Sequence, residues 1–431
     1  MTDQRRRSDN QRLLIAMHIP ILPLLTSFGI ADAGLLQLYA THILHLEEDK
    51  IGMVIGLPAL VIPLQLLGIY VVRRLGNKHT VMLGFSLLFC LLPLMLLIPG
   101  IYHQNASLGF ALLCATVLSM HLAHNCTKGI ALQPMIREST LPIERGRFLG
   151  RMRLFVNGFN LLFFAALSVL FGARVDVGEY AWITFFLMGY CVFAIAVIHP
   201  FRSARADDDN HLPDLSRYNF LQDLRSALTC GRYRLILAIT VLSFLSSLPL
   251  FVTYLSNGLQ LGASRISQLI AVSTVGNMAG LFVWGRLIDR VGFLRVLSLT
   301  LSLSAIAGLL WLPARFAVPL QGIPLSLVVL ALIAILTGFL QSGLKLALLV
   351  GVHNSVTKHQ AIMALAIFNT GLMILGGLGA VGVGYYLDLT LAGWRFDLGP
   401  FPVDSYQILG LAGALLCAVA GYVARSARGR A

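Results

Sequence analysis

The sequence has little charge, and least of all negative charge. Only 12% of the 431 residues are charged, and 19 acidic residues stand against 32 lysines and arginines. A typical soluble domain carries about a quarter charged residues, so the composition argues against a soluble protein. The phosphate-binding pattern G-x-x-x-x-G-K-[ST] is missing, which argues against ATP as the energy source. The six cysteines form no C-x-x-C pair and resemble small buried apolar residues, so we expect no disulfide framework.

Long apolar runs make up most of the chain. Hydrophobic residues are 57% of the total, and the mean hydropathy is +0.80. Only helices and closed barrels satisfy backbone polar groups within lipid, and these runs do not alternate as barrel strands would. At roughly 20 residues for each crossing, they predict about twelve membrane helices. The predicted helices span residues 13–40, 50–72, 79–101, 107–136, 148–172, 179–200, 234–257, 264–288, 293–313, 322–350, 360–387 and 404–424.

One long polar segment, from Phe201 to Arg234, divides this pattern into two equal sets. We therefore expect an all-α integral membrane protein of about 12 transmembrane helices, arranged as two parallel-repeat six-helix bundles. No cleavage-site pattern follows the basic N-terminal segment, so no cleavable signal peptide is expected. The expected divisions are a cytosolic tail at 1–12, an N-terminal bundle at 13–200, a cytosolic central loop at 201–233, a C-terminal bundle at 234–424 and a cytosolic tail at 425–431.

Basic residues are concentrated on one side of this predicted topology. If the N-terminus is cytosolic, the outer loops contain only Lys50, Arg174, Arg265, Arg315 and Arg395. The positive-inside rule then predicts that both termini are cytosolic, in a multi-pass protein of the plasma or bacterial inner membrane. The net charge of +13 is therefore attributed to topology and to contact with anionic headgroups, and not to nucleic-acid binding.

The chain repeats itself at an offset of 217 residues. Gly68 corresponds to Gly285, and Lys128 corresponds to Lys345. Parallel repeats with a binding site between them, near the membrane midplane, are a common architecture of secondary transporters. The offset also identifies where the halves differ, since Val72 stands opposite Asp289.

The loop after the eighth predicted helix carries the most specific motif. It reads Gly285-Arg-Leu-Ile-Asp289-Arg290-Val-Gly292-Phe-Leu-Arg295 and resembles the G-x-x-x-D-R-x-G-x-x-R signature of the major facilitator superfamily. Gly285 should let two helices approach closely, and Asp289 should accept from a helix N-terminus or from an arginine. Arg290 and Arg295 should face lipid headgroups or close the cytosolic gate.

The first half carries a degenerate copy of this motif. It contains Gly68 and Arg73, but Val72 replaces the aspartate, and the second glycine, Gly76, comes one residue late. We therefore expect closure of the inner gate to depend more on the second copy.

The resemblance covers essentially the whole chain and implies a secondary active transporter that works by alternating access. We expect a monomer in the lipid bilayer that moves a small polar organic solute, anionic or zwitterionic. Protons are the expected coupling ion. No cofactor, enzymatic activity or nucleic-acid partner is expected.

Ionisable residues within the predicted helices are the main candidates for function. They cost on the order of 2.5–3.5 kcal/mol on membrane-insertion scales. His121, His124 and Lys128 share one helix face, and Gln341 and Lys345 are the repeat equivalents of His124 and Lys128. Two lysines facing one cavity would favour an anionic or zwitterionic solute. The alternatives are snorkelling toward the cytosol or ion pairs with a neighbouring helix.

Asp32 lies in the outer part of the first predicted helix, about 30 Å of helix beyond Arg12. It is either a proton-coupling carboxylate or an outer carboxylate that caps a helix or pairs with a neighbour. A further polar set is expected to line part of the cavity, although each member alone could instead form a helix–helix hydrogen bond. This set is Gln37, Arg153, Asn157, Asn160, Tyr254, Asn277 and Asn369.

Other functions stay open. The drug/proton antiporters of the superfamily have a Gly-Pro-rich fifth helix, whereas the fifth predicted helix here lacks proline. A transition-metal permease would use His121 and His124, but Cys126 points about 200° around the helix from His124. A non-transporting membrane protein is a further alternative. A membrane enzyme is disfavoured because the helices contain no paired carboxylates and no Ser/His/Asp set.

Overall fold

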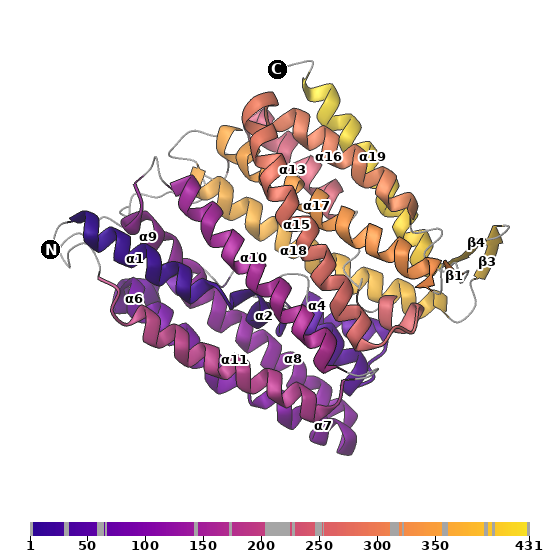
Figure 1. The fold of residues 1–431 in the computed structure, drawn as a ribbon, viewed down its shortest axis with the longest axis horizontal. Helices are drawn as coiled ribbons and strands as arrows, with labels where there is room; N and C mark the ends of the chain where they lie inside the picture. The colour runs from indigo at the N-terminus through magenta and orange to yellow at the C-terminus, as the bar shows by residue number, and fades with distance from the viewer. Residues whose placement is uncertain are drawn as a thin grey trace. The chain divides into compact units, whose positions relative to one another are not determined.

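The chain folds into two compact helical units, Met1–Asp214 and Leu215–Ala431 (Figure 1). They are described here from a computed structural model. It describes residues 3–29, 34–57, 64, 67–141, 145–171, 175–202, 225, 229–245, 252, 254–310, 319–320, 323–355, 361–391, 395–398 and 401–428.

Helices alone make up the secondary structure described in the first unit. In this unit α6 packs against α8, α11 and the π-helical segment η3, and α1 packs against α9 and α11. In chain order the elements are α1 (Asp3–His18), α2 (Ile21–Thr26), α3 (Gly34–Leu38), η1 (Tyr39–Ile43), α4 (Glu48–Gly56), α6 (Leu67–Leu91), α7 (Leu94–Gln104), α8 (Ala106–Ala123), η3 (His124–Gly129), α9 (Ile130–Ser139), α10 (Arg145–Leu170) and α11 (Val177–Ile198).

The second unit adds two short antiparallel β-hairpins to its helices. Each hairpin leads directly into a long helix, β1–β2 into α17 and β3–β4 into α19, and α17 packs closely against α15 and α16. The elements are α13 (Gly231–Leu245), η5 (Tyr254–Gly258), α15 (Ala263–Val291), α16 (Phe293–Gly308), β1 (Pro319–Leu320), β2 (Ile323–Pro324), α17 (Leu325–Ser355), α18 (Ala361–Leu391), β3 (Arg395–Leu398), β4 (Phe401–Asp404) and α19 (Ser405–Arg428).

The first predicted helix is divided in the structure. α1 begins at Asp3, well before the predicted start at residue 13, and its polar residues Asn10 and Gln11 bond to segments far away in the chain. The Asn10 side-chain amide donates to the Arg202 carbonyl at 2.8 Å, and its oxygen accepts from the Arg202 backbone N–H. α1 ends at His18, just before Pro20, which has no N–H with which to continue the helix.

Both signature loops are made by a glycine with positive φ. Gly76 has φ of 76° and Gly292 has φ of 85°, a backbone conformation that residues with a Cβ rarely adopt. Gly292 separates α15 from α16, whereas α6 runs through the expected loop at 73–78 and bends at Gly76. The two glycines therefore both provide the positive φ at which the signature loop changes direction. They are 216 residues apart, one fewer than the repeat offset of 217.

Seven helices in the described part of the chain are long and apolar enough to cross a membrane. They support a multi-pass membrane protein. The predicted total of about twelve stays a prediction, because several predicted spans are divided, are shorter or extend beyond the described residues. The seven are Arg74–Gln104, Ala106–Ile136, Gly150–Leu170, Val177–Ile198, Ala263–Val291, Leu325–Val352 and Ser405–Ala427.

A π-helical turn beside a tyrosine pair occurs in each unit. Tyr39, the first residue of η1, has its ring centroid 4.6 Å from that of Tyr180 near the start of α11. Tyr254, the first residue of η5, has its ring centroid 4.8 Å from that of Tyr406 in the first turn of α19. The two tyrosine pairs therefore show that the two units share local packing, although the tyrosines themselves are not 217 residues apart.

The two helices α11 and α19, which carry Tyr180 and Tyr406, begin with the same kind of N-terminal cap. Asp176 and Glu179 form a capping box at the start of α11. Asp404 and Gln407 do the same at the start of α19, with backbone bonds of 3.1 and 3.2 Å. The Gln407 amide also donates to the Tyr254 hydroxyl at 3.2 Å, which links the cap to the tyrosine pair.

Glycines set the closest helix contacts in the second unit. A Cβ added to Gly276 in α15 would lie 2.1 Å from the Ile335 carbonyl oxygen of α17, so only glycine permits this approach. The sequence predicted that role for Gly285. A Cβ there would meet nothing closer than Leu346, at 3.9 Å, so within the second unit the close approach occurs earlier in α15, and the role of Gly285 stays a prediction.

Candidate functional site

Four buried basic side chains lie in the first unit. His18 is at the end of α1, His121 is in α8, and His124 and Lys128 are in η3. Their exposed fractions are 5%, 2%, 8% and 4%, respectively. We call these four residues the basic cluster. Within the described part of the chain, no carboxylate forms an ion pair with Lys128.

Two of the histidines have their tautomers set by backbone carbonyls. The Nδ1 of His18 lies 2.8 Å from the Leu14 carbonyl oxygen, and the Nε2 of His121 bonds to the Phe28 carbonyl. A carbonyl oxygen can only accept, so each of these nitrogens carries the hydrogen. The remaining nitrogens, Nε2 of His18 and Nδ1 of His121, are buried lone-pair acceptors with no hydrogen-bond partner among the described residues.

Aromatic rings from other parts of the first unit surround the basic cluster. The Phe28 ring lies 5.3 Å from the His121 ring and 6.0 Å from the His124 ring. Lys128 Nζ lies 6.0 Å from the centre of the Phe85 ring of α6. Phe85 in turn contacts Tyr190 of α11, whose hydroxyl donates to the Met17 carbonyl of α1 at 2.7 Å.

The π-helical geometry of η3 depends on close packing against α6. A Cβ on Gly68 would lie 2.2 Å from the Cys126 carbonyl oxygen, and one on Gly84 would lie 2.1 Å from the Thr127 hydroxyl. The Thr127 hydroxyl also donates to the carbonyl of Ala123, at the start of the π segment. π-Bulges are rare and frequently occur at functional sites.

Lys345 has surroundings unlike those of its repeat equivalent. It is exposed on α17, whereas Lys128 is buried. Thr337 is exposed, Gln341 is partly exposed, and with Lys345 they follow each other at intervals of four residues on one helix face. α17 is α-helical throughout, while the π turn in η3 inserts an extra residue and rotates the side chains after it by about 100°. Equal sequence positions therefore point in different directions.

The predicted lining residues are placed variously. Asp32 lies outside the described residues, and so does the side chain of Asn369. Arg153 is exposed, and Asn277 is partly exposed. The buried members of the set are Gln37 at 1%, Asn157 at 9%, Asn160 at 8% and Tyr254 at 1% exposed.

The predicted gate motif of the second unit is at the surface. Asp289, Arg290, Gly292 and Arg295 are all exposed. Asp289 forms no ion pair with the described residues, so its arginine partner stays a prediction. In the first copy, Gly68 is buried against η3, and the side chain of Arg73 lies outside the described residues.

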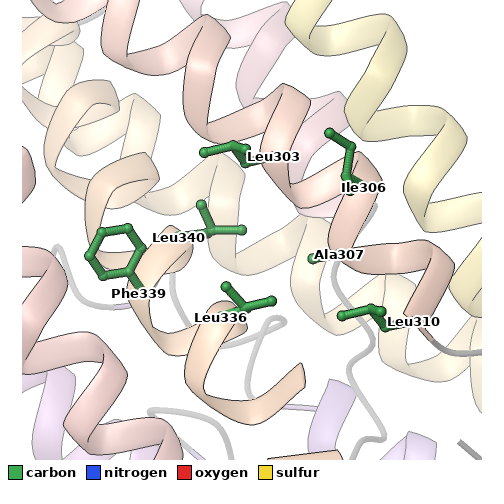
Figure 2. A pocket seen from close by; sticks show the side chains of 7 residues that line it. All are labelled: Leu303, Ile306, Ala307, Leu310, Leu336, Phe339 and Leu340. Atoms are coloured by element: carbon green, nitrogen blue, oxygen red, sulfur yellow. The ribbon is translucent and has the colours of Figure 1, made fainter. Parts of the chain in front are cut away.

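A wholly apolar pocket of about 180 Å³ lies between α16 and α17 (Figure 2). Its lining includes exposed side chains, such as Ile306 at 62% and Leu303 at 36% exposed. Such a surface suits lipid chains and offers a polar solute no hydrogen bond. Its lining residues are Leu303, Ile306, Ala307, Leu310, Leu336, Phe339 and Leu340.

The histidines of the basic cluster do not form a recognisable metal centre. In the part of the chain that the structure describes, no group of three or more His, Cys, Asp or Glu side chains is placed to hold a metal ion. His18 and His121 each use one ring nitrogen on a backbone carbonyl. The arrangement is better suited to holding a proton than a metal.

Sequence reasoning did not single out His18. It has no repeat equivalent, because position 235 is leucine. The depth of His18 from the predicted cytosolic side of the membrane could have identified it. His18 lies about 9 Å of helix beyond Arg12, and Lys128 lies about 13 Å of helix before Arg137, so the two residues reach similar depths from the predicted cytosolic side.

Comparison with known proteins identifies the fold. No protein-family model matches the chain, and no curated protein sequence matches it. Among solved structures, a mutant of the nucleoside transporter NupG is similar, with a TM-score of 0.70 and 14% identity over 98% of this chain and 99% of that one. A D-xylose–proton symporter has a TM-score of 0.67 and 13% identity, covering 97% and 96% of the two chains. The inward-open xylose transporter XylE from E. coli has a TM-score of 0.61 and 13% identity, covering 97% and 94%.

These similar structures are transporters of the major facilitator superfamily. At 13–14% identity the likeness concerns the fold. The chain is therefore a multi-pass helical membrane protein with the major facilitator fold, as its signature loop predicted.

Proposed function

We propose that this protein is a secondary active transporter that moves a small polar organic solute by alternating access, coupled to protons. The solute is proposed to be anionic or zwitterionic. The fold supports transport, because the similar structures are named as a nucleoside transporter and a D-xylose–proton symporter. Those names also point to hydroxylated organic molecules rather than to apolar drugs.

The polar face of α17 is the observation that carries this proposal. Leu332 and Leu336 are exposed on the same helix, but Gln341 lies about 140° around the axis from Leu336. α17 therefore exposes an apolar face, suited to lipid, and a separate face bearing Thr337, Gln341 and Lys345. A charged side chain that faced lipid would be costly, so we assign the polar face to a water-filled solute path.

The basic cluster is proposed to have a different role from the polar face of α17. Lys128 and the histidines are almost completely buried, so they do not offer a surface to a solute in this conformation. Buried groups that exchange a proton can still respond to the solute through movement of their helices. We therefore assign coupling to the basic cluster, with Asp32 as a second coupling candidate.

The remaining parts of the proposal rest on the sequence. The distribution of basic residues supports cytosolic termini and a plasma or bacterial inner membrane location, and we propose a monomer without a cofactor. Drug/proton antiport is not favoured by the similar structures. Transition-metal transport lacks a ligand cluster among the described residues.

Ligand binding tests the assignment of α17. The purified full-length protein is screened by thermal shift against nucleosides, pentoses, hydroxylated organic acids and cationic drugs. A solute at 100 times its Kd should stabilise the native protein by about 2.7 kcal/mol. In Lys345→Ala the affinity for that solute should fall about 10- to 100-fold, which is the loss of roughly 1.4–2.8 kcal/mol of binding energy.

An exposed lysine outside the proposed path provides the control. Lys50 pairs with Glu47 at 2.6 Å, so Lys50→Ala removes a lysine without touching α17. Its affinity should equal that of the wild type. Binding that is indifferent to Lys345, or binding only by cationic drugs, contradicts the proposed solute class.

A further inference from the structure

We propose that the apolar pocket between α16 and α17 holds one acyl chain of an anionic phospholipid, and that Arg295 at the start of α16 binds the headgroup of that lipid. This inference rests on the membrane fold, and it does not depend on the proposed solute or on proton coupling. Both helices belong to the second unit.

The pocket opens at the surface of the second unit and has a buried floor. Ala307 of α16 and Leu340 of α17 are 8% and 3% exposed, whereas Ile306 at the rim is 62% exposed. Figure 2 shows the pocket between side chains of the two helices, none of which carries a polar group. An apolar space of about 180 Å³ attracts little water, and its walls lose dispersion contacts when it is empty. The pocket therefore favours an apolar occupant.

The wall formed by Phe339 is held in place by α15. The Phe339 ring centroid lies 5.1 Å from that of Trp284, and the Trp284 indole N–H donates to the Phe339 carbonyl oxygen at 2.8 Å. A Cβ added to Gly280 of α15 would lie 2.5 Å from the same carbonyl oxygen, so the two helices are in close contact here. These contacts preform one wall of the pocket, which lowers the cost of ordering when a ligand binds.

The pocket lies near the middle of the apolar span of α17. This span is Leu325–Val352. Leu336 lies about 16 Å of helix after its start, and Leu340 lies about 18 Å of helix before its end. The hydrocarbon core of a bilayer is about 30 Å thick, so each leaflet contributes about 15 Å. An acyl chain that begins at the membrane surface therefore ends at the depth of this pocket.

A stripe of exposed side chains on α16 joins the pocket to one end of the helix. Arg295 is the only charged residue in the sequence of α16, and it precedes Ile306 by three helical turns. The two side chains therefore lie within about 20° of each other around the helix and about 16 Å apart along it. The stripe has the length of one acyl chain and a cation at its end, which is the arrangement that an anionic lipid requires. Its exposed residues are Arg295, Leu299, Ser302, Leu303, Ile306 and Leu309.

The charges around Arg295 favour a negatively charged headgroup. Arg286, Arg290 and Arg295 stand near the turn between α15 and α16 with one acidic residue, Asp289, and all four are exposed. Arg295 forms no ion pair with the described residues, so its guanidinium is available to a lipid phosphate. An excess of positive charge attracts anionic headgroups more strongly than zwitterionic ones. We therefore assign the pocket to an anionic phospholipid of the leaflet on the Arg295 side.

Photolabelling locates the acyl chain. The full-length protein in nanodiscs receives phosphatidylglycerol that carries a diazirine at the end of one acyl chain, and mass spectrometry identifies the labelled peptides. We expect the label to concentrate in residues 303–310 and 336–340. The comparison is Leu415 of α19, which is 67% exposed near the middle of its own apolar span but lies outside the pocket. Equal labelling of the two regions would mean that bulk lipid alone covers the pocket, and it overturns the proposal. A pocket protected from the label in a dimeric protein would assign it to a second copy and also overturns the proposal.

One substitution tests the acyl-chain site. Ala307→Phe fills the floor of the pocket, so labelling of the pocket should fall about 10-fold, which corresponds to about 1.4 kcal/mol. Ala115→Phe adds the same ring at an exposed position of α8 and should leave the labelling unchanged.

A second substitution tests the headgroup site. Arg295→Gln should lower the labelling about 5-fold, because one arginine contributes about 1 kcal/mol near an anionic surface. Arg265→Gln removes an exposed arginine at the other end of α15 and serves as the control. Since Arg295 is exposed, this variant tests the proposal even if Ala307→Phe fails to fold.

A change of lipid tests the same headgroup site. Phosphatidylcholine with the same diazirine should label the pocket about 5-fold less than phosphatidylglycerol at an equal mole fraction. Equal labelling by the two lipids overturns the proposal, and so does labelling that is unchanged in either folded variant. Solute transport is measured separately, so failure of the lipid site leaves the proposed function intact.

Discussion

At the scale of single residues, the two repeat-related lysines illustrate how one sequence position acquires two roles. Lys128 is buried beside histidines and an aromatic ring, and Lys345 is exposed on a polar helix face. The difference arises from the π turn of η3, which has no counterpart in α17. Repetition in the sequence predicted that both lysines matter. It could not predict their orientations, since the π turn depends on contacts with α6 that are far away in the chain.

The burial of Lys128 predicts that the native lysine lowers stability. Methionine has a similar volume and no charge, so Lys128→Met should raise the free energy of unfolding by about 1–3 kcal/mol. Residues retained at such a cost are expected at functional sites. Thermal unfolding of the purified protein in one detergent measures the effect, with Lys345→Met as the control that should stay within about 0.5 kcal/mol.

A loss of stability in Lys128→Met would contradict this view of the site. It would indicate that a buried negative group pairs with Lys128, because removing one partner of a buried ion pair is destabilising by about 3–5 kcal/mol. The basic cluster would then lack one of the residues of the coupling centre.

At the scale of elements, long apolar runs determine where the helices form, and small residues determine how closely the helices pack. A Cβ on Gly338 of α17 would lie 2.0 Å from the Ser273 carbonyl oxygen of α15, next to the contact of Gly276 with Ile335. Backbone atoms cannot move away as a flexible side chain can. These glycines therefore fix the distance between α15 and α17, and with it the position of the polar face of α17.

Substitution at this contact should be costly. Gly338→Ala should destabilise the protein by about 1–3 kcal/mol, as overpacking does in other tightly packed interiors. Gly379→Ala on α18 is the matched control, since a Cβ there meets nothing within 4 Å, and it should be neutral or slightly stabilising. Thermal unfolding of the two variants compares them directly. Equal stabilities would show that α15 and α17 do not need glycine at this point.

The sequence predicted the positions of the helices better than the π turns that interrupt them. Hydropathy indicated the positions of the long helices, and the signature motifs indicated the turns now seen at Gly76 and Gly292. The π turns were not predictable from local pattern. The segment with His124 and Lys128 reads as an ordinary helix face, and the glycines that allow its π geometry, Gly68 and Gly84, lie more than one helix away.

At the scale of the whole molecule, the two repeated units share local structural features but differ in where their charged side chains lie. Each unit has a π turn with a tyrosine pair and a capped helix. Only the first contains the basic cluster, and only the second exposes a lysine at the matching position. The fold was predictable from hydropathy, the repeat and one loop motif. His18 was not predicted, because the other members of the basic cluster lie more than 100 residues away in the chain and it has no counterpart in the repeat.

Gradient-driven flux through the full-length protein in proteoliposomes tests the central claim most directly. The solute that binds best in the thermal-shift panel is added outside vesicles that carry an imposed pH gradient, alkaline inside or, for an exporter, acidic inside. The account predicts accumulation above that in empty vesicles, collapse of the gradient-driven part when a protonophore is added, and a rate at least 10-fold lower in Lys345→Ala. Flux that no pH gradient changes, or no flux of any solute in the panel above that of empty vesicles, would contradict it.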